Sequence, residues 1–417
     1  MPFNQTLSTD PQPNNLPRRT FLGGAAGVAA GAIALKTARA ARSDDKPYRV
    51  AVIGHTGKGG YGHHLDTVWL DVSETEIVAV ADANPEGLGD AVKRLNNPAG
   101  YLDYRKMLDE TKPDLVSIAL GNIDQHCDMT VAAAESGARG IYMEKPLCRT
   151  LEEADRMVAA CEKHGVKLAT AHTYRYVPKL PVVREIIQSG KLGRVLEFRA
   201  RGKEDHRGGS IDLWVLGTHM LDLMNHLGGG PAACFGTVLQ EGRPVTSGDV
   251  HEAPQYGIGP LAGDEVHATY RLGGGATGYF DSIRGAGTKP PWRFGLWIFG
   301  TEGLLYIRPG QQPFLMPTYF SDDPLWFPES SGKQWIPVTS AGIGNPEPLE
   351  GGHLHDANVR AADDLIDAIE QDRQPLSNVY ESRTTLEMIV AVFESHRLAS
   401  QVSIPLQNRQ NPMAMLD

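Results

Sequence analysis

The chain of 417 residues has few cysteines, no excess of basic residues and no long apolar run beyond its first forty residues. The four cysteines (Cys127, Cys148, Cys161, Cys234) lack metal-type spacing, so buried free thiols are expected. With 40 Lys and Arg against 50 Asp and Glu, the net charge of −10 argues against nucleic acid or an anionic membrane surface as main partner. The mature chain is expected to be soluble, outside the membrane, and to act on a small molecule.

The N-terminal stretch PRRTFLGGAAGVAAGAIALKTARA predicts a twin-arginine export signal over residues 1–40. Arg18 and Arg19 precede a weakly apolar run over 21–35, and residues 38–40 form an Ala-x-Ala cleavage site. A membrane anchor is the alternative, but the run is shorter than the ~20 apolar residues that span a bilayer. We therefore expect the twin-arginine machinery as a partner and a periplasmic or otherwise exported protein.

Apolar strand patterns alternate with helical patterns over residues 47–170. Runs such as YRVAVIG, EIVAVAD and DLVSIAL are separated by stretches such as CDMTVAAAESGA and LEEADRMVAACEKHG. This rhythm predicts an α/β fold whose first domain is a Rossmann-type, doubly wound parallel sheet.

The pattern changes after about residue 195, within a second domain expected over 171–417. GRVLEFRARG, DEVHATYRLGG, ATGYFDSIRG and RFGLWIFGTEGLLYIR follow one another without intervening helices. They predict an α+β domain with an open, mainly antiparallel sheet, closed by helices in NVRAADDLIDAIEQ and ESRTTLEMIVAVFESHRLAS.

A glycine-rich loop follows the first strand directly. Its candidate nucleotide-binding glycines are Gly54, Gly57, Gly59 and Gly62. Glycines let a backbone approach a pyrophosphate, whose charge is held by amides at the N-terminus of the helix expected next. A merely flexible loop is the alternative.

Asp82 ends the second strand, where a carboxylate can accept hydrogen bonds from an adenosine ribose. It would repel a 2′-phosphate, and no arginine stands beside it in ADANPEG. NAD is therefore predicted as the cofactor in preference to NADP.

From residue 47 onward the chain resembles the glucose-fructose oxidoreductase / inositol dehydrogenase / MocA (Gfo/Idh/MocA) family. The resemblance rests on the order and spacing of VADANPE, YRKMLDETKPDLVSIAL, MEKPL, GTHMLDLMNHLGG and IFGTEGLL. It implies that Lys145 lies between nicotinamide and substrate and that His219 is the acid/base. It also places residues 174–176 near the nicotinamide, and the cofactor candidates it adds are Asn122, Glu144, Lys145 and Arg175.

Oxidation of a secondary alcohol needs a group that takes the hydroxyl proton and a donor to the same oxygen. His219 suits the first role and Lys145 the second. Many family members carry Asp four residues before the histidine, where this chain has Val215. Asp222, three residues after His219, is the candidate to orient it and completes the predicted catalytic set, with a partly buried structural carboxylate as the alternative.

Residues near the second-domain helix supply candidates for binding sugar hydroxyls. They are His206, Arg207, Asp212 and Trp214, with Tyr176 from the segment before. A solvated polar loop is the alternative. No metal is predicted, because HLHD at 353–356 shows no third ligand.

Three functions stay open. The first is a sugar, polyol or glycoside oxidoreductase with tightly bound, internally recycled cofactor, since free NAD is scarce outside the cytoplasm. The second is an NAD-dependent glycosidase that oxidises, eliminates, hydrates and reduces. The third is a nucleotide-binding protein without catalysis, against which Lys145 and His219 argue. The resemblance also implies a homo-oligomer, dimer or tetramer.

Overall fold

The computed structural model describes residues 46–287, 293–309, 316–325, 333–349 and 352–417. The predicted signal segment 1–40 lies outside these residues. The described residues up to 417 belong to one compact unit, and all element bounds below refer to it.

The first sheet has six parallel strands among the described residues, in the order β3-β2-β1-β4-β5-β6. The strands are β1 Tyr48–Ile53, β2 Thr75–Ala81, β3 Ala99–Tyr101, β4 Leu115–Ile118, β5 Gly140–Met143 and β6 Lys167–Thr170. Every residue of β4 and β5 is buried, as expected for parallel strands covered on both faces. The predicted doubly wound parallel sheet is confirmed.

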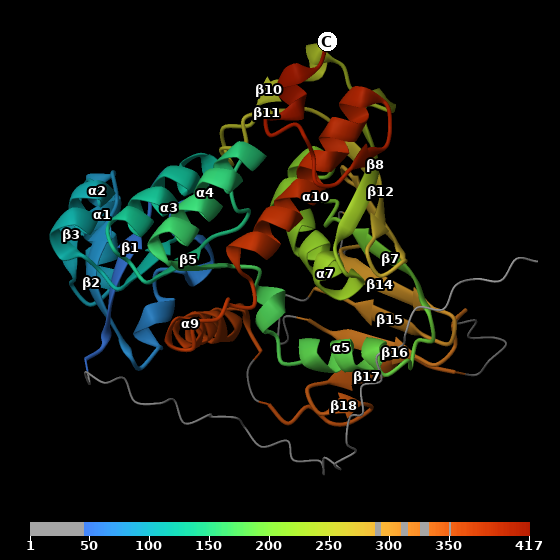
Figure 1. The fold of residues 1–417 in the computed structure, drawn as a ribbon, viewed down its shortest axis with the longest axis horizontal. Coiled ribbons are helices and arrows are strands. Elements are labelled where there is room, and N and C mark those ends of the chain that lie inside the picture. The colour runs from blue at the N-terminus through green and yellow to red at the C-terminus, as the bar shows by residue number, and fades with distance from the viewer. Residues whose placement is uncertain (1–45, 288–292, 310–315, 326–332, 350–351) are drawn as a thin grey trace, which may run out of the picture. The chain divides into compact units, whose positions relative to one another are not determined.

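Helices cover this sheet, and capping residues mark where some of them begin and end. The helices between its strands are α1 Pro85–Arg94, α2 Tyr104–Thr111, α3 His126–Glu135 and α4 Leu151–His164. The Asn84 side chain caps α1, the Thr150 hydroxyl caps α4, and Gly165 ends α4 in the left-handed conformation. Helix α9 Leu354–Glu370 returns from the C-terminal part of the chain and packs on β5 and β6 (Figure 1).

The second sheet is mainly antiparallel, as predicted, with one parallel pair between β7 and β13. Its main strands are β7 Val195–Arg201, β8 Pro231–Gln240, β12 Glu265–Leu272, β13 Thr277–Ile283, β14 Gly295–Gly300, β15 Leu304–Ile307, β16 Thr318–Ser321, β17 Ile336–Thr339 and β18 Gly342–Ile343. Short strands β9 Arg243–Pro244 and β19 Val402–Ser403 pair with β8, whereas β10 His251–Glu252 and β11 Pro260–Leu261 form a separate two-stranded sheet. Burial alternates along β12 and β13, so one face of the sheet is covered and the other is open.

Helices α7 Thr218–Gly228 and α10 Val379–Leu398 lie on the covered face, α7 against β7 and β13 and α10 against β8 (Figure 1). Helix α10 also touches α4, so it joins the two layers. The remaining helical pieces are α5 Leu180–Gln188, α6 Ser210–Asp212, the π-helical turn Leu213–Gly217, and the 3₁₀ turns Gly62–His64, Val68–Leu70, Ile123–Gln125, Thr173–Tyr176, Ser247–Asp249 and Pro412–Met415.

All four cysteines are buried and free, which confirms that prediction. Among the helices of the described segments, none has the length and apolar character needed to cross a bilayer. Within those same segments no cluster of three or more His, Cys, Asp or Glu is arranged to hold a metal ion. His353 instead caps α9, and His355 pairs with Asp71.

Candidate active site

The site lies at the carboxyl edge of the parallel sheet, where the loops after β1, β2, β4 and β5 meet. Strands β1 and β4 are neighbours at the centre of the strand order, and the chain leaves them toward opposite sides of the sheet. Ligands of open α/β sheets bind at such a crossing of connections. Apart from Arg175, which lies in the turn after β6, the predicted nucleotide-binding residues belong to these loops.

The glycine loop (residues 54–64) needs its glycines for close packing. A Cβ atom at Gly54 would collide with the Tyr61 ring, and one at Gly62 would lie 2.6 Å from the Glu144 Oε1 atom. Gly59 has a φ of +78°, and a Cβ there would lie 2.6 Å from the Gly121 nitrogen. The loop therefore packs against the backbone of the segment after β4, and no side chain is tolerated at that contact.

The α-helix expected directly after the glycine loop is not formed, and that prediction is wrong. Two 3₁₀ turns follow instead, Gly62–His64 and Val68–Leu70. His63 and His64 adopt left-handed backbone conformations that interrupt helical geometry. The Asn358 amide of α9 donates to the His63 carbonyl at 2.8 Å and holds this conformation. Diphosphate binding by amides at a long helix's N-terminus is therefore not a feature of this loop.

Asp82 lies at the end of β2 and lines a cavity of about 210 Å³, here called the Asp82 cavity. Its carboxylate accepts hydrogen bonds from the Thr56 backbone nitrogen and, at 2.7 Å, from the Thr56 hydroxyl. The Asn84 nitrogen donates to it at 2.9 Å. Asp82 thus presents negative charge to this cavity and also fixes the glycine loop, and its role in ribose binding stays a prediction.

A second cavity of about 230 Å³, here called the Lys145 cavity, contains the predicted catalytic lysine. Gly59, Gly62, Asn122 and Glu144, predicted cofactor-binding residues, line it as well. Gly57 has a φ of +91° with open space around it, so it serves the turn of the loop. The structure thus brings Lys145 together with the predicted nucleotide loops, and the catalytic role of Lys145 stays a prediction.

Lys145 is almost fully buried, and its ammonium nitrogen donates to the Val215 carbonyl at 2.9 Å. Burial lowers the pKa of Lys145 below its ordinary value, and the Arg207 cation lowers it further. The neighbouring Glu144 carboxylate opposes this change. A buried amine with a depressed pKa can bind a substrate oxygen and exchange a proton with it.

Glu144 does not contact the Lys145 ammonium. Its carboxylate accepts from the Lys145 backbone nitrogen at 2.9 Å and pairs with the His63 ring. Burial by itself raises the pKa of Glu144, but His63 and Lys145 outweigh that effect and lower it to about 2. Glu144 is thus ionised and ties the glycine loop to the strand that carries Lys145.

Val215 and Leu216 belong to the π-helical turn Leu213–Gly217, and both line the Lys145 cavity. Turns of this kind are rare and occur frequently at functional sites. The turn places a backbone carbonyl beside the lysine at the position where the family resemblance suggested a carboxylate.

His219 follows this turn on α7 and is partly buried, but it is not among the residues that line the Lys145 cavity. Its ring packs edge-on against Tyr174 and His172, at centroid distances of 5.1 and 5.9 Å. Burial lowers its pKa well below the ordinary value, with smaller effects from Lys145 and His172. The Nδ1 atom is buried without a hydrogen-bond partner. A neutral, unpartnered imidazole fits a group that accepts a proton, which stays a prediction here.

Asp222 does not orient His219, and that prediction is wrong. The Arg175 guanidinium holds its carboxylate with two hydrogen bonds of 2.7 and 2.8 Å. Both side chains are 1% exposed. Burial raises the pKa of Asp222, but Arg175 outweighs it and the net pKa is lowered. Arg175 is predicted to bind the cofactor, but its guanidinium pairs with Asp222 on α7 and with Glu381 on α10. It therefore links these two helices.

Of the predicted substrate residues, only Arg207 lines the Lys145 cavity. Asp205 holds its guanidinium with bonds of 3.0 and 2.6 Å. The His206 side chain is 83% exposed and points to no partner in this cavity. Arg207 is therefore the one cation of the predicted set that can reach a substrate there.

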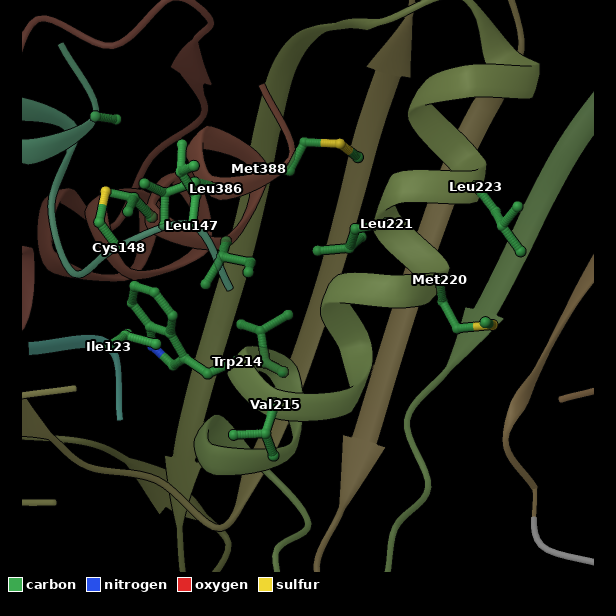
Figure 2. Close-up of a cluster of buried hydrophobic side chains, with 14 of the residues drawn as sticks. Ile123, Leu147, Cys148, Trp214, Val215, Met220, Leu221, Leu223, Leu386 and Met388 are labelled. Atoms are coloured by element: carbon green, nitrogen blue, oxygen red, sulfur yellow. The ribbon is translucent and has the colours of Figure 1, made fainter. Parts of the chain in front are cut away.

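The other three predicted substrate residues are structural, which corrects the prediction. Trp214 packs in the core shown in Figure 2 and stacks on Phe393 at 6.5 Å between ring centroids. Asp212 is buried and accepts from the Ser282 hydroxyl at 2.6 Å. The Tyr176 hydroxyl accepts from the Ser377 nitrogen at 3.1 Å. Trp214 lies in the π-helical turn, Asp212 in α6 just before it and Tyr176 in the turn after β6, and all three side chains contact the protein interior.

Sequence reasoning missed several residues of the site. His63 lines the Lys145 cavity, and its position beside Gly62 was the available signal. Gln255, Tyr256 and Ile258 line it too, from a segment here called the strap, residues 253–259. The strap is anchored because Ile123 donates to the Tyr256 carbonyl at 3.1 Å. No periodicity marks this loop, so nothing in the sequence indicated it.

The fold and the site together define a dinucleotide-binding oxidoreductase: a glycine-rich loop, an acidic residue at the end of β2, and a buried lysine that lines a cavity at the same edge of the sheet. Residues 48–172 match the oxidoreductase family with an NAD-binding Rossmann fold, and residues 182–306 match the Gfo/Idh/MocA C-terminal domain. The chain belongs to the Gfo/Idh/MocA family of NAD-dependent oxidoreductases.

Two relatives with known activities are sugar dehydrogenases. The levoglucosan dehydrogenase of Pseudarthrobacter phenanthrenivorans is 30% identical over 267 residues, which cover 58% of this chain and 67% of that protein. The D-glucoside 3-dehydrogenase of Escherichia coli is 30% identical over 200 residues, 45% of this chain and 55% of that protein. A levoglucosan dehydrogenase structure with NADH and levoglucosan superposes with a TM-score of 0.68 at 22% identity, covering 87% of this chain and all of that one. At 22% identity, this structural similarity shows a shared fold.

Proposed function

We propose that this protein is an exported dehydrogenase that oxidises a secondary alcohol of a sugar, polyol or glycoside and retains its NAD between turnovers. The observation that carries the proposal is the buried Lys145 amine, which lines a cavity together with residues of the nucleotide loops. The sugar dehydrogenases among the relatives support the substrate class. The twin-arginine pattern of residues 1–40 supports export to the periplasm.

The cavity suits a compact carbohydrate. Lys145, Asn122 and Arg207 offer polar groups, while Val215, Leu216 and Ile258 form an apolar wall. Carbohydrates present both hydroxyl groups and C–H faces, and a pocket with a few converging polar groups orients such a ligand. Because Asp205 already neutralises Arg207, this guanidinium acts mainly as a hydrogen-bond donor, which favours an uncharged sugar.

In the proposed mechanism, Lys145 binds the reacting hydroxyl and holds it by a hydrogen bond, while the Val215 carbonyl orients the amine. NAD, when bound, supplies the hydride acceptor. Lys145 in its neutral form takes the hydroxyl proton, and its lowered pKa makes that form available at a lower pH than for an ordinary lysine. His219, with its free Nδ1, is the second group proposed to receive this proton. The Val215 and Leu216 side chains keep water away from the amine.

The direct test is to purify the mature protein from the periplasm and to identify its nucleotide by absorbance and mass. We expect about one NAD per chain, retained through dialysis, which requires a dissociation constant in the nanomolar range or below. Addition of levoglucosan or a glucoside should then produce close to one equivalent of reduced nicotinamide. Protein that emerges empty and exchanges NAD freely contradicts retention, and phenol release from an aryl glycoside without added NAD indicates the redox-neutral glycosidase instead.

We further propose that the chain forms a homo-oligomer through the open face of the second sheet. Phe235 is 48% exposed on β8, and Trp297 stacks on Tyr306 at 4.2 Å across β14 and β15. Exposed apolar area of this kind is usually covered by a partner. Light scattering on the variant Phe235→Lys tests it, because a charge there should lower the measured mass if the face is an interface.

A further inference from the structure

Two loops touch at the centre of the carboxyl edge. The glycine loop (residues 54–64) follows β1, and residues 119–125, here called the β4 segment, follow β4. A dinucleotide that reaches from Asp82, at the end of β2, to Lys145, after β5, must cross both of them because β1 and β4 lie between. The crossing is where the diphosphate of a bound dinucleotide is expected.

Direct contacts join the two loops at this crossing. The Lys58 ammonium nitrogen lies 2.8 Å from the Asp124 carboxylate. The His55 ring is 2.8 Å from the Gln125 side-chain oxygen. In addition, the Gly59 backbone packs on Gly121 so closely that no Cβ fits. The glycine loop is therefore closed onto the β4 segment.

The ties lie between the two cavities of the site. His55 and Gln125 line the Asp82 cavity, whereas Gly59 and Asn122 line the Lys145 cavity. Asp124 is fixed from its other side by the strap, because a Cβ at Gly257 would lie 3.0 Å from the Asp124 nitrogen. The β4 segment is thus held by the strap on one side and by the glycine loop on the other.

We propose that the glycine loop is a clasp over the diphosphate crossing and that Lys58 and Asp124 are positioning residues whose ion pair must open for nucleotide to exchange. The proposal rests on the proposed retention of NAD and gives it a structural cause. The ion pair is partly exposed, at 42% and 25% of the two side chains, so it opens at a modest cost. Breaking it should raise the rates of nucleotide binding and release together, by about fivefold.

The experiment measures nucleotide exchange without any sugar. Bound NADH is displaced by excess NAD, and its fluorescence gives the release rate; stopped-flow mixing with nucleotide-depleted protein gives the binding rate. The variants are Lys58→Met and Asp124→Asn. The control is Lys167→Met, which breaks a pair of the same 2.8 Å length with Asp372 at the amino end of β6, away from the site.

We expect both rates to rise in both test variants and to stay unchanged in the control. Gly59→Ala should raise both rates as well, since its Cβ would push the loops apart without changing charge. If Lys58→Met speeds only release while Asp124→Asn slows it, Lys58 is a plain phosphate ligand and the clasp is overturned. Unchanged rates, or equal changes in the control, also overturn it. The exchange rates are measured without sugar. A protein that fails to oxidise sugars can therefore still show the expected rate changes, and a protein that oxidises sugars can still show unchanged exchange rates.

Discussion

The Lys145 ammonium nitrogen donates to the Val215 carbonyl at 2.9 Å, at the position where related sequences suggested an aspartate. A backbone carbonyl orients the amine but carries no net charge. Burial therefore lowers the pKa of Lys145 with only Glu144 in opposition. The proposed catalytic amine is neutral more easily than it would be beside a second carboxylate.

Replacement of Lys145 by alanine should lower kcat by about 10² or more while nucleotide stays bound, since acid–base and oxyanion contributions have that size. Lys145→Arg should lose nearly as much, because a guanidinium cannot give up its proton. Turnover and nucleotide content are measured on the same samples, with Lys167→Ala as control. Wild-type turnover in either Lys145 variant would remove the lysine from the mechanism.

Val215→Asp should raise the pKa of Lys145, because a carboxylate beside the amine favours its charged form. In the wild type, kcat/KM for alcohol oxidation should rise with pH as Lys145 loses its proton. In the variant this rise should move to higher pH, and Val215→Asn should leave it in place. An unshifted profile in a folded Val215→Asp protein would show that Lys145 does not set the pH dependence.

Asp82→Ala should weaken the preference for NAD over NADP, because the repulsion toward a 2′-phosphate disappears. Thr56→Val is the matched control, since it removes the 2.7 Å hydroxyl bond to Asp82 but keeps the carboxylate. Dissociation constants for both nucleotides are measured by fluorescence. A preference that survives in Asp82→Ala places the ribose elsewhere.

The buried pair Arg175–Asp222 should be costly to break from one side. Arg175→Met removes the guanidinium that holds the buried Asp222 carboxylate, and Asp222→Leu leaves Arg175 with the partly exposed Glu381 as its acidic partner. Each variant should lower the free energy of unfolding by about 3–5 kcal/mol. The double variant should regain most of this loss. Urea unfolding of the four proteins measures it, and additive losses in the double variant would contradict the pairing.

Acid should destabilise the protein before its carboxylates titrate. Burial lowers the pKa of His226 to about 4, with Arg175 adding to the effect. Burial also lowers the pKa of His172 and His219. Below the unfolded value of about 6.5 the unfolded chain binds protons that the native state does not. The free energy of unfolding should therefore fall with pH from about 6.5 downward, by up to about 1.4 kcal/mol per unit for each such histidine.

The matched variant for this prediction is His226→Gln, which should reduce the slope between pH 6.5 and 5. Urea unfolding at several pH values measures it. An equal slope in wild type and variant would mean that His226 is protonated in the native state.

Much of the fold was predictable because its patterns are local. The apolar run YRVAVI is buried along nearly its whole length, as a central parallel strand requires, and β12 of the second sheet buries every second side chain. The Lys145 cavity was predictable in part, since parallel strands bring the loops after β1, β4 and β5 to one edge. The chain positions of Asp82, Glu144 and Lys145 thus indicated the site.

The partners of buried polar groups were not predictable in the same way. Asp222 lies three residues from His219 on α7, yet it binds Arg175, which is 47 residues away in the sequence. Likewise Trp214 faces Phe393 instead of a substrate, because the π-helical turn changes the angular spacing of side chains. A one-dimensional pattern does not encode such a rotation.

By itself the sequence determined the order of strands and helices and the parallel sheet, because short-range periodicity encodes both. It also determined which loops carry the glycines, Asp82 and Lys145, because parallel strands end at the same edge of the sheet. Only the tertiary structure decided that the glycine loop closes on the β4 segment, that the strap at 253–259 forms a wall of the cavity, and that a carbonyl replaces a carboxylate beside Lys145. These depend on contacts between segments far apart in the chain, where burial requires each polar group to find a partner wherever the fold provides one.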